Sequence, residues 1–193
     1  MTSGQGSRPA ETVQDARVAR TRSDVARAAL EVLTQEGSDA VTHAKIAEVA
    51  GYSKTTLYAH WPARLDLIAV ALDGIGEMPH HERSGDLRTD LIGELTVFRQ
   101  AVIEMHLDRL LAGMAQWASA EEMRLIRDKI NSDGQRPLRT MLAESFDGYQ
   151  LEAAVSMLSG VVACPSIMFG KLPDDGTISA AVDIVLASRR NRS

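Results

Sequence analysis

The apolar residues of this chain recur every three or four positions along most of its length, which is the spacing of one face of an α-helix. The first such stripe follows Asp24 and stops before Gly37, a residue type that commonly ends helices. Its members are Val25, Ala29, Val32 and Leu33. Residues 1–22 are poor in apolar side chains and contain several arginines, and we predict a flexible basic arm there.

Two short helices follow, each with its own start and stop signals. Thr42 can cap the sequence HAKIAEVA, and Gly51 can end it. Ser53 can cap the sequence KTTLYAH, in which Leu57 and Trp61 lie one turn apart.

Further helices are predicted over most of the remaining chain. Pro62 favours the start of a fourth helix, whose stripe is Leu65, Ile68, Ala69 and Leu72. A connection at 74–85 precedes predicted helices over 87–102, near 105–118, from Ala120 onward, over 151–165 and over 178–186. Gly134 and Pro137 predict a kink or break, and Pro165 predicts a helix end. No segment alternates with the period of a strand, so we predict an all-α fold.

The charge balance constrains the class of partner. The net charge of −5 argues by itself against nucleic acid, but the charge is unevenly distributed. Residues 1–64 hold eight Lys and Arg against seven Asp and Glu, whereas residues 65–193 hold 13 against 19. The N-terminal third can therefore present cations to a phosphate backbone.

A single cysteine, Cys164, excludes an intrachain disulfide and fits a reducing cytoplasm. The N-terminus lacks the apolar core of a secretion signal. Residues 153–170 carry no charge and have the length of a short membrane span, but a proline, a glycine and three serines interrupt them. We therefore expect a cytoplasmic protein without membrane contact, in which this segment is buried in an interface.

Residues 42–61, THAKIAEVAGYSKTTLYAHW, carry the functional signal. Two short helices joined by a tight glycine-containing turn form a helix-turn-helix. Ala47 and Ala50 allow the helices to cross closely, and Gly51 tolerates the positive φ of the turn. Recognition helices contact base edges with polar residues near their N-terminus. Those residues here are Lys54, Thr55 and Thr56.

This stretch resembles the signature of the tetracycline-repressor (TetR) family. In that signature Ile-Ala-x-x-Ala-Gly leads through a serine-containing turn to Thr-Leu-Tyr-x-His-Phe. The chain matches it at Ile46–Gly51, Ser53 and Thr56–Trp61, and the resemblance spans roughly residues 24–72. Three residues depart from the usual ones: Tyr52 for Val, Trp61 for Phe and Arg64 for Lys.

The resemblance implies that Lys54 and Thr55 face the major groove of DNA, while other residues lie near phosphates and sugars. These others are Thr42, His43, Lys45, Ser53, Thr56, Tyr58, His60 and Arg64. Tyr58 has a second interpretation as a half-buried structural residue, since its ring is largely apolar. Arg17, Arg20 and Arg22 either reach the adjacent minor groove or are simply solvated.

The family architecture is an N-terminal three-helix head joined by a linking helix to a C-terminal helical domain. It implies an arm at 1–22, a DNA-binding head at 23–62 and a ligand-binding and dimerisation domain at 63–193. A head reads one half-site, so two heads, and hence a homodimer, are expected. The expected interface lies on the last two long helices, at Leu151, Val155, Leu158, Val162, Ile178, Val182 and Val185.

The helices over 86–145 are expected to enclose a small-molecule pocket. Its expected lining residues are Phe98, Val102, Met105, Leu110, Met114, Trp117 and Met141. Methionine-rich walls adapt to varied apolar ligands, so an apolar effector is favoured. The alternative is that these side chains are ordinary core.

The sequence thus predicts a ligand-responsive repressor that binds a palindromic operator in double-stranded DNA as a homodimer and is released by its effector. An activator would have the same features. No catalytic motif or metal-ligand spacing is present, so we expect no enzyme activity, no metal and no cofactor. A protein that binds another protein through its helices is the remaining alternative, and the polar residues at 54–56 favour DNA instead.

Overall fold

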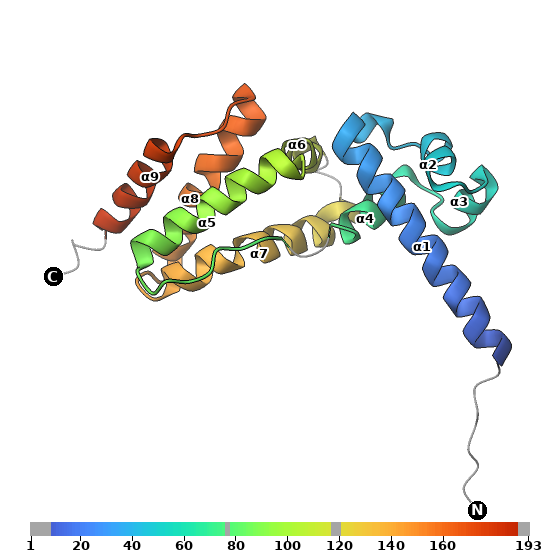
Figure 1. Cartoon of the computed structure of the whole chain (residues 1–193), viewed down its shortest axis with the longest axis horizontal. Coiled ribbons are helices and arrows are strands. Elements are labelled where there is room, and N and C mark those ends of the chain that lie inside the picture. The colour runs from blue at the N-terminus through green and yellow to red at the C-terminus, as the bar shows by residue number, and fades with distance from the viewer. Residues whose placement is uncertain (1–8, 76–77, 117–120, 189–193) are drawn as a thin grey trace, which may run out of the picture. The chain divides into compact units, whose positions relative to one another are not determined.

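The computed structural model describes residues 9–75, 78–116 and 121–188, and all regular structure within these ranges is helical (Figure 1). The predicted all-α fold is therefore confirmed. The chain divides into two units, Met1–Gly76 and Glu77–Ser193.

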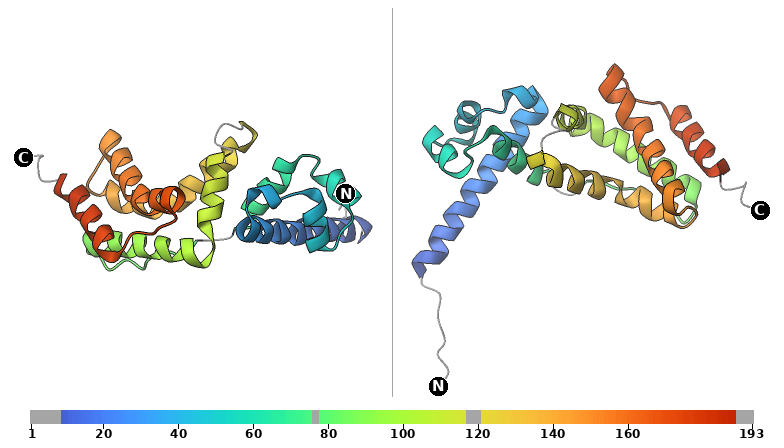
Figure 2. Two further views of the ribbon diagram at one scale, coloured as in Figure 1. Left: turned by 90° about the horizontal axis from the view of Figure 1, so that it is seen from above. Right: turned by 180° about the vertical axis from the view of Figure 1, so that it is seen from behind.

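The first unit contains α1 (Pro9–Glu36), the 3-10 turn η1 (Ser38–Ala40), α2 (His43–Ala50), α3 (Lys54–His60) and α4 (Arg64–Asp73). α1 packs against α2 and α4, and α2 packs against α3 (Figure 2). Aliphatic side chains from all four α-helices are fully buried between them. They include Val25, Ala29, Leu33, Ile46, Leu57, Leu67 and Ile68.

α1 is longer than its apolar stripe. It begins at Pro9, so residues 9–22, expected to form a flexible arm, are helical instead. Proline fits the first turn of a helix because its missing N–H would have no partner there, and this signal marks the start that hydrophobic spacing does not show. Arg22 then joins α1 to α4 through an ion pair with Asp73 at 2.9 Å.

α4 belongs to the first unit, because it packs along α1. The first unit extends to Gly76, whereas the expected DNA-binding head ends at residue 62. The helix itself begins at Arg64 rather than at Pro62, since the Ala63 N–H donates to the Asp66 carboxylate at 2.7 Å and so starts the helix two residues later.

The second unit contains α5 (Leu87–Glu104), α6 (Leu107–Gln116), α7 (Glu121–Ala143), α8 (Gly148–Phe169) and α9 (Asp175–Ala187). α5 packs against each of the other four helices (Figure 2). Two arginines of α5 also hold the α9 region. Arg88 pairs with Asp183 at 2.7 Å, and Arg99 pairs with Asp175 at 2.6 Å.

α7 and α8 both continue through a proline, contrary to expectation. Pro137 lies inside α7, which is unbroken, and Pro165 lies inside α8, which ends only at Gly170 with φ of 61°. A proline inside a helix removes one backbone hydrogen bond and strains the preceding turn. Leu138 and Ser166, the residues after the two prolines, are both buried, so tertiary packing holds each helix across its proline.

Asp90 of α5 fixes the non-helical segment that precedes the helix. Its carboxylate is fully buried and accepts hydrogen bonds from the Ser84 hydroxyl at 2.6 Å, the Ser84 N–H at 2.7 Å and the Gly85 N–H at 3.1 Å. Hydrogen bonds to a carboxylate favour its ionised form, and those from Ser84 lower the pKa of Asp90 to about 2.

Glu94, one turn further along α5, holds the same segment. It is buried, accepts from the His81 N–H at 2.9 Å and lies 2.9 Å from Nδ1 of His80. The His81 ring rests on Gly93, where an added Cβ would lie 2.5 Å from Nδ1 of that ring. Two buried carboxylates and one glycine of α5 thus determine the course of residues 78–86.

Asp90→Asn should lower the thermal stability of the protein and flatten its loss of stability in acid. Because the folded state favours ionised Asp90, its contribution is complete above the ordinary Asp pKa of about 4 and is lost as the pH falls toward 2. The free energy of unfolding of the wild type should therefore fall more steeply over that interval than that of the variant. Urea unfolding curves recorded at about pH 7, 4 and 2.5 measure how the free energy of unfolding of each protein depends on pH.

Glu82→Gln is the matched control, since Glu82 is an exposed carboxyl of the same segment. It should leave the acid dependence of the wild type unchanged. Equal slopes for Asp90→Asn and the wild type would contradict the assigned role of Asp90.

Candidate nucleic-acid interface

The turn between α2 and α3 is built by local hydrogen bonds. The Thr42 hydroxyl accepts from the Lys45 N–H at 3.2 Å and caps α2, and the Ser53 hydroxyl accepts from the Thr56 N–H at 3.1 Å and caps α3. Between them Gly51 has φ of 74°, a left-handed conformation that favours glycine. These signals give both short helices the bounds expected from the sequence.

α3 separates an apolar side from a polar one. Leu57 and Trp61 are buried, whereas Lys54 and Thr55 at the start of the helix are exposed. Within the described part of the chain, neither Lys54 nor Thr55 has a side-chain hydrogen bond or ion pair. This free polar turn has the form of a DNA-reading surface.

Five further candidates lie on α3 or at the caps of α2 and α3. The Thr42 and Ser53 hydroxyls act as caps, and Thr56 and Ser53 share a hydrogen bond at 2.8 Å between their hydroxyl oxygens. His60 is exposed at the end of α3. The side chain of Tyr58 is exposed over 54% of its surface.

His43 lies elsewhere than expected. Its side chain is only 8% exposed, so it does not extend toward solvent from the start of α2. The imidazole stacks on the ring of Tyr58 and bonds to the carbonyl oxygen of Trp61. The expected phosphate contact of this side chain conflicts with its burial.

Arg64 and Lys45 already have partners inside the first unit. Nε of Arg64 donates to the Val41 carbonyl at 3.0 Å, and its guanidinium also bonds to the Ser38 carbonyl and pairs with Asp39 at 3.3 Å. Arg64 therefore clamps η1, a role that the spacing of residues 38–64 does not reveal.

Lys45 pairs with Glu36 at the end of α1, with 2.8 Å between Nζ and Oε1. The hydrogen bond that Lys45 donates to this carboxylate raises the pKa of Lys45. Because Glu36 neutralises the ammonium group, Lys45 is a weaker phosphate ligand than its position in the motif suggests.

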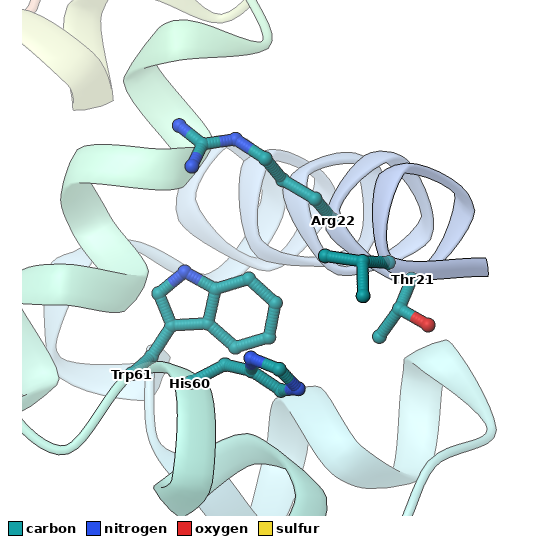
Figure 3. A pocket seen from close by; sticks show the side chains of 5 residues that line it. Thr21, Arg22, His60 and Trp61 are labelled. Atoms are coloured by element: carbon teal, nitrogen blue, oxygen red, sulfur yellow. The ribbon is translucent and has the colours of Figure 1, made fainter. Parts of the chain in front are cut away.

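α1 also carries the arginines Arg17, Arg20 and Arg22, of which Arg22 lies beside the end of α3. Arg17 and Arg20 are exposed, and Arg20 lies 4.0 Å from Asp24. A small hollow lies between α1 and the end of α3. Figure 3 shows Thr21 and Arg22 of α1 beside His60 and Trp61, and these four residues together with Val18 line a hollow of about 100 Å³. Small-molecule sites usually have volumes of about 300 Å³ or more, so this hollow is too small to be an effector pocket.

Tyr52 replaces the valine of the family signature and also acts inside the unit. Its hydroxyl donates to the Asp24 carboxylate at 3.0 Å and so ties the turn after Gly51 to α1. This contact, rather than one with phosphate, explains the tyrosine.

The residues expected at a dimer interface face the interior of their own chain. Leu151 is half-buried, and the other six are buried. These six are Val155, Leu158, Val162, Ile178, Val182 and Val185. The prediction followed the strongest aliphatic stripes, and such stripes pack first against the core of the protomer.

A different apolar face of α8 and α9 is exposed. On α8 it has helical spacing and contains no charged residue, and α9 continues the same composition. Its members are Ala153, Met157, Cys164, Ile167 and Met168 on α8 and Ala180, Ile184 and Ala187 on α9. α8 is also the one helix in the described ranges that is long and apolar enough to cross a membrane by length and composition.

The described residues expected in the pocket lie on or at the end of α5, on α6 and on α7, and α5 contacts both of the other helices. Val102 of α5, Leu110 and Met114 of α6, and Met141 of α7 are buried, and Phe98 and Met105 are half-buried. Trp117 lies outside the described residues. The described residues contain no group of three His, Cys, Asp or Glu side chains that could hold a metal ion.

Comparison with known proteins points to one family. Residues 25–71 match the family model described as "Bacterial regulatory proteins, tetR family". An uncharacterized HTH-type transcriptional regulator of Mycobacterium bovis is 26% identical over 174 residues, which cover 85% of this chain and 85% of that protein. The DNA-binding transcriptional repressor TetR of Mycobacteroides abscessus is 39% identical over 74 residues, which cover 37% of this chain and 39% of that protein.

A solved structure extends the likeness to the fold. The crystal structure of a TetR family transcription regulator is similar to this chain, with a TM-score of 0.62 and 25% sequence identity. The match covers 86% of this chain and 97% of the other. Three findings point to the same family: the helix-turn-helix of α2 and α3, the match to the family model, and the helical second unit. Residues 25–71 therefore form a TetR-family domain, in a chain that is similar over most of its length to bacterial transcriptional regulators.

Proposed function

We propose that this protein is a cytoplasmic, dimeric repressor that binds a palindromic operator through α3 and releases it when an apolar small molecule binds the second unit. The observation that carries the proposal is the exposed first turn of α3. Lys54 and Thr55 stand there without a side-chain partner in the described part of the chain, on a helix held rigidly by its caps and by Leu57.

The two residues have the chemistry needed to read bases. A lysine can donate to the O6 and N7 acceptors of guanine, and a threonine offers a hydroxyl for hydrogen bonds and a methyl group for thymine. Nearby hydroxyls of Thr42, Ser53 and Tyr58 can bond to phosphate oxygens, which fixes the register of the helix on the duplex. Lys54 and Thr55 thus supply base contacts and the surrounding residues supply backbone contacts.

Lys54→Ala should reduce discrimination between the operator and a scrambled duplex by about tenfold or more, since one good base contact contributes about 1–3 kcal/mol. The operator is first selected from a random duplex library with the wild-type protein, and affinities are measured by fluorescence anisotropy at several salt concentrations. Lys129→Ala, which removes an exposed lysine of α7, is the matched control and should change neither affinity. An equal loss on both duplexes would show that Lys54 contacts only the backbone.

The exposed face of α8 and α9 favours a second copy of the chain as its occupant. Met157 of α8 and Ile184 of α9 are more than half exposed, and the α8 face from 153 to 168 lacks charge. Small residues such as Ala153 and Ala180 would let helices of two protomers approach closely. Two heads joined in this way meet two operator half-sites, as the palindromic arrangement requires.

Met157→Asp or Ile184→Asp should convert the dimer to monomers at micromolar concentration, because each places a charge in the proposed apolar interface. Light scattering coupled to gel filtration measures the mass. Leu125→Asp, at an equally exposed apolar residue on α7, is the control and should leave the dimer intact. A wild-type mass of one chain would contradict this interface.

Release by an effector is supported by the connectivity of the chain. α4 ends at Asp73, and residues 78–86 are tied by Asp90 and Glu94 to α5, the helix that carries Phe98 and Val102 of the expected pocket. A ligand that moves α5 would therefore move the segment leading to the head. Linkage requires the ligand to prefer the DNA-free state by about 1.4 kcal/mol for each tenfold loss of operator affinity.

Met105→Trp should raise the concentration of effector needed for release by about tenfold or more and leave operator affinity unchanged, because the larger ring fills space at the junction of α5 and α6. A panel of apolar compounds is titrated into the labelled protein–operator complex to find the effector and then to compare variants. Leu125→Trp, on an exposed site, is the control. A compound that binds free and operator-bound protein equally would contradict release by linkage.

A further inference from the structure

His43 begins α2, a position at which a polar side chain would ordinarily extend into solvent. Here only 8% of the surface of His43 is exposed to solvent. Its two partners are Tyr58 of α3 and Trp61, the C-cap of α3, so one side chain of the first motif helix reaches across to the second.

The first partner is the ring of Tyr58. The two ring centroids lie 3.9 Å apart and the ring planes differ by 9°, so the rings are nearly parallel. The imidazole covers one face of the tyrosine ring, while 54% of the tyrosine side chain remains exposed. The Tyr58 hydroxyl has no hydrogen-bond partner in the described part of the chain.

The second partner is the backbone carbonyl of Trp61, which follows the last residue of α3. Nε2 of His43 lies 2.6 Å from this oxygen, and because a carbonyl can only accept, Nε2 carries the donated hydrogen. Carbonyl groups at the end of a helix lack an intrahelical partner, so this bond satisfies one of them. It also fixes the imidazole plane against which Tyr58 rests.

We propose that His43 is a positioning residue for DNA recognition, which holds the ring of Tyr58 so that its hydroxyl is already directed at the DNA backbone before binding. The proposal rests on the proposed function, in which Tyr58 contacts phosphate or sugar. It replaces the expected phosphate contact of His43 with an indirect role. A side chain that is ordered in advance loses less conformational entropy when it binds.

The role separates into two parts that different substitutions remove. His43→Phe keeps a flat ring beneath Tyr58 and loses the hydrogen bond to Trp61. His43→Gln keeps a donor and loses the ring. If the stack positions Tyr58, His43→Gln should weaken operator binding by about two- to tenfold, the effect of freeing one side chain, whereas His43→Phe should stay within about twofold of the wild type.

The decisive measurement is a double-mutant cycle on operator affinity, with the duplex selected by the wild-type protein. In the Tyr58→Phe background no hydroxyl remains to be positioned, so His43→Gln should cause no further loss. Val32→Ala is the matched control: it destabilises the same unit from a buried site in α1 and should leave operator affinity unchanged. All affinities are measured below the lowest melting temperature of the set.

Three results would overturn the proposal. An equal loss for His43→Gln with Tyr58 and in the Tyr58→Phe background would mean that His43 only supports the fold. Full operator affinity of Tyr58→Phe, with a loss in Lys54→Ala, would mean that Tyr58 does not touch DNA although the proposed function stands. Failure of the wild-type protein to select any duplex would remove the proposed function itself.

Discussion

A helix of seven or eight residues is not stable in water by itself, since isolated helices need about 12–15 residues even with favourable sequences. α2 has eight residues and α3 has seven, so both depend on packing: α2 packs against α1, and α3 packs against α2. The fully buried side chains of Val25, Ala29 and Leu33 belong to the core that α1 forms with these helices. The caps select where each short helix begins, and the packing of α2 on α1 and of α3 on α2 stabilises both helices.

Several polar side chains of the first unit bond to other segments of the same unit and so add to this support. Arg64 holds η1, Tyr52 bonds to Asp24, and Arg22 pairs with Asp73. Each bond joins segments that are distant in sequence. Fewer cations of the first unit are therefore unpaired than the motif alone suggests, and the exposed Lys54 is one that has no partner in the described part of the chain.

The sequence was most informative where structure is set locally. The bounds of α2 and α3 follow from capping residues and Gly51, and all of them were predicted. The start of α1 was missed because its first turns have little apolar periodicity, although Pro9 carries the signal. The roles of His43 and Arg64 could not be predicted, because the partners of His43 lie at least 15 residues away, those of Arg64 lie at least 23 residues away, and no spacing rule connects them. The stripe of Val155 and its neighbours was predicted to lie between protomers, whereas these residues are buried in their own chain. Burial inside the protomer and burial between protomers have the same pattern in a sequence.

Asp90 and Glu94 determine where the junction of a chimeric regulator can be placed. Residues 78–86 have no helix or strand of their own, and their path is specified by two carboxylates and a glycine of the next helix. The sequence that dictates the shape of this connection therefore lies downstream of it, in α5. A chimera that joined a foreign head at the start of α5 would leave both carboxylates buried without donors. A junction placed before residue 78 would keep residues 78–86 together with the Asp90 and Glu94 side chains that fix their path.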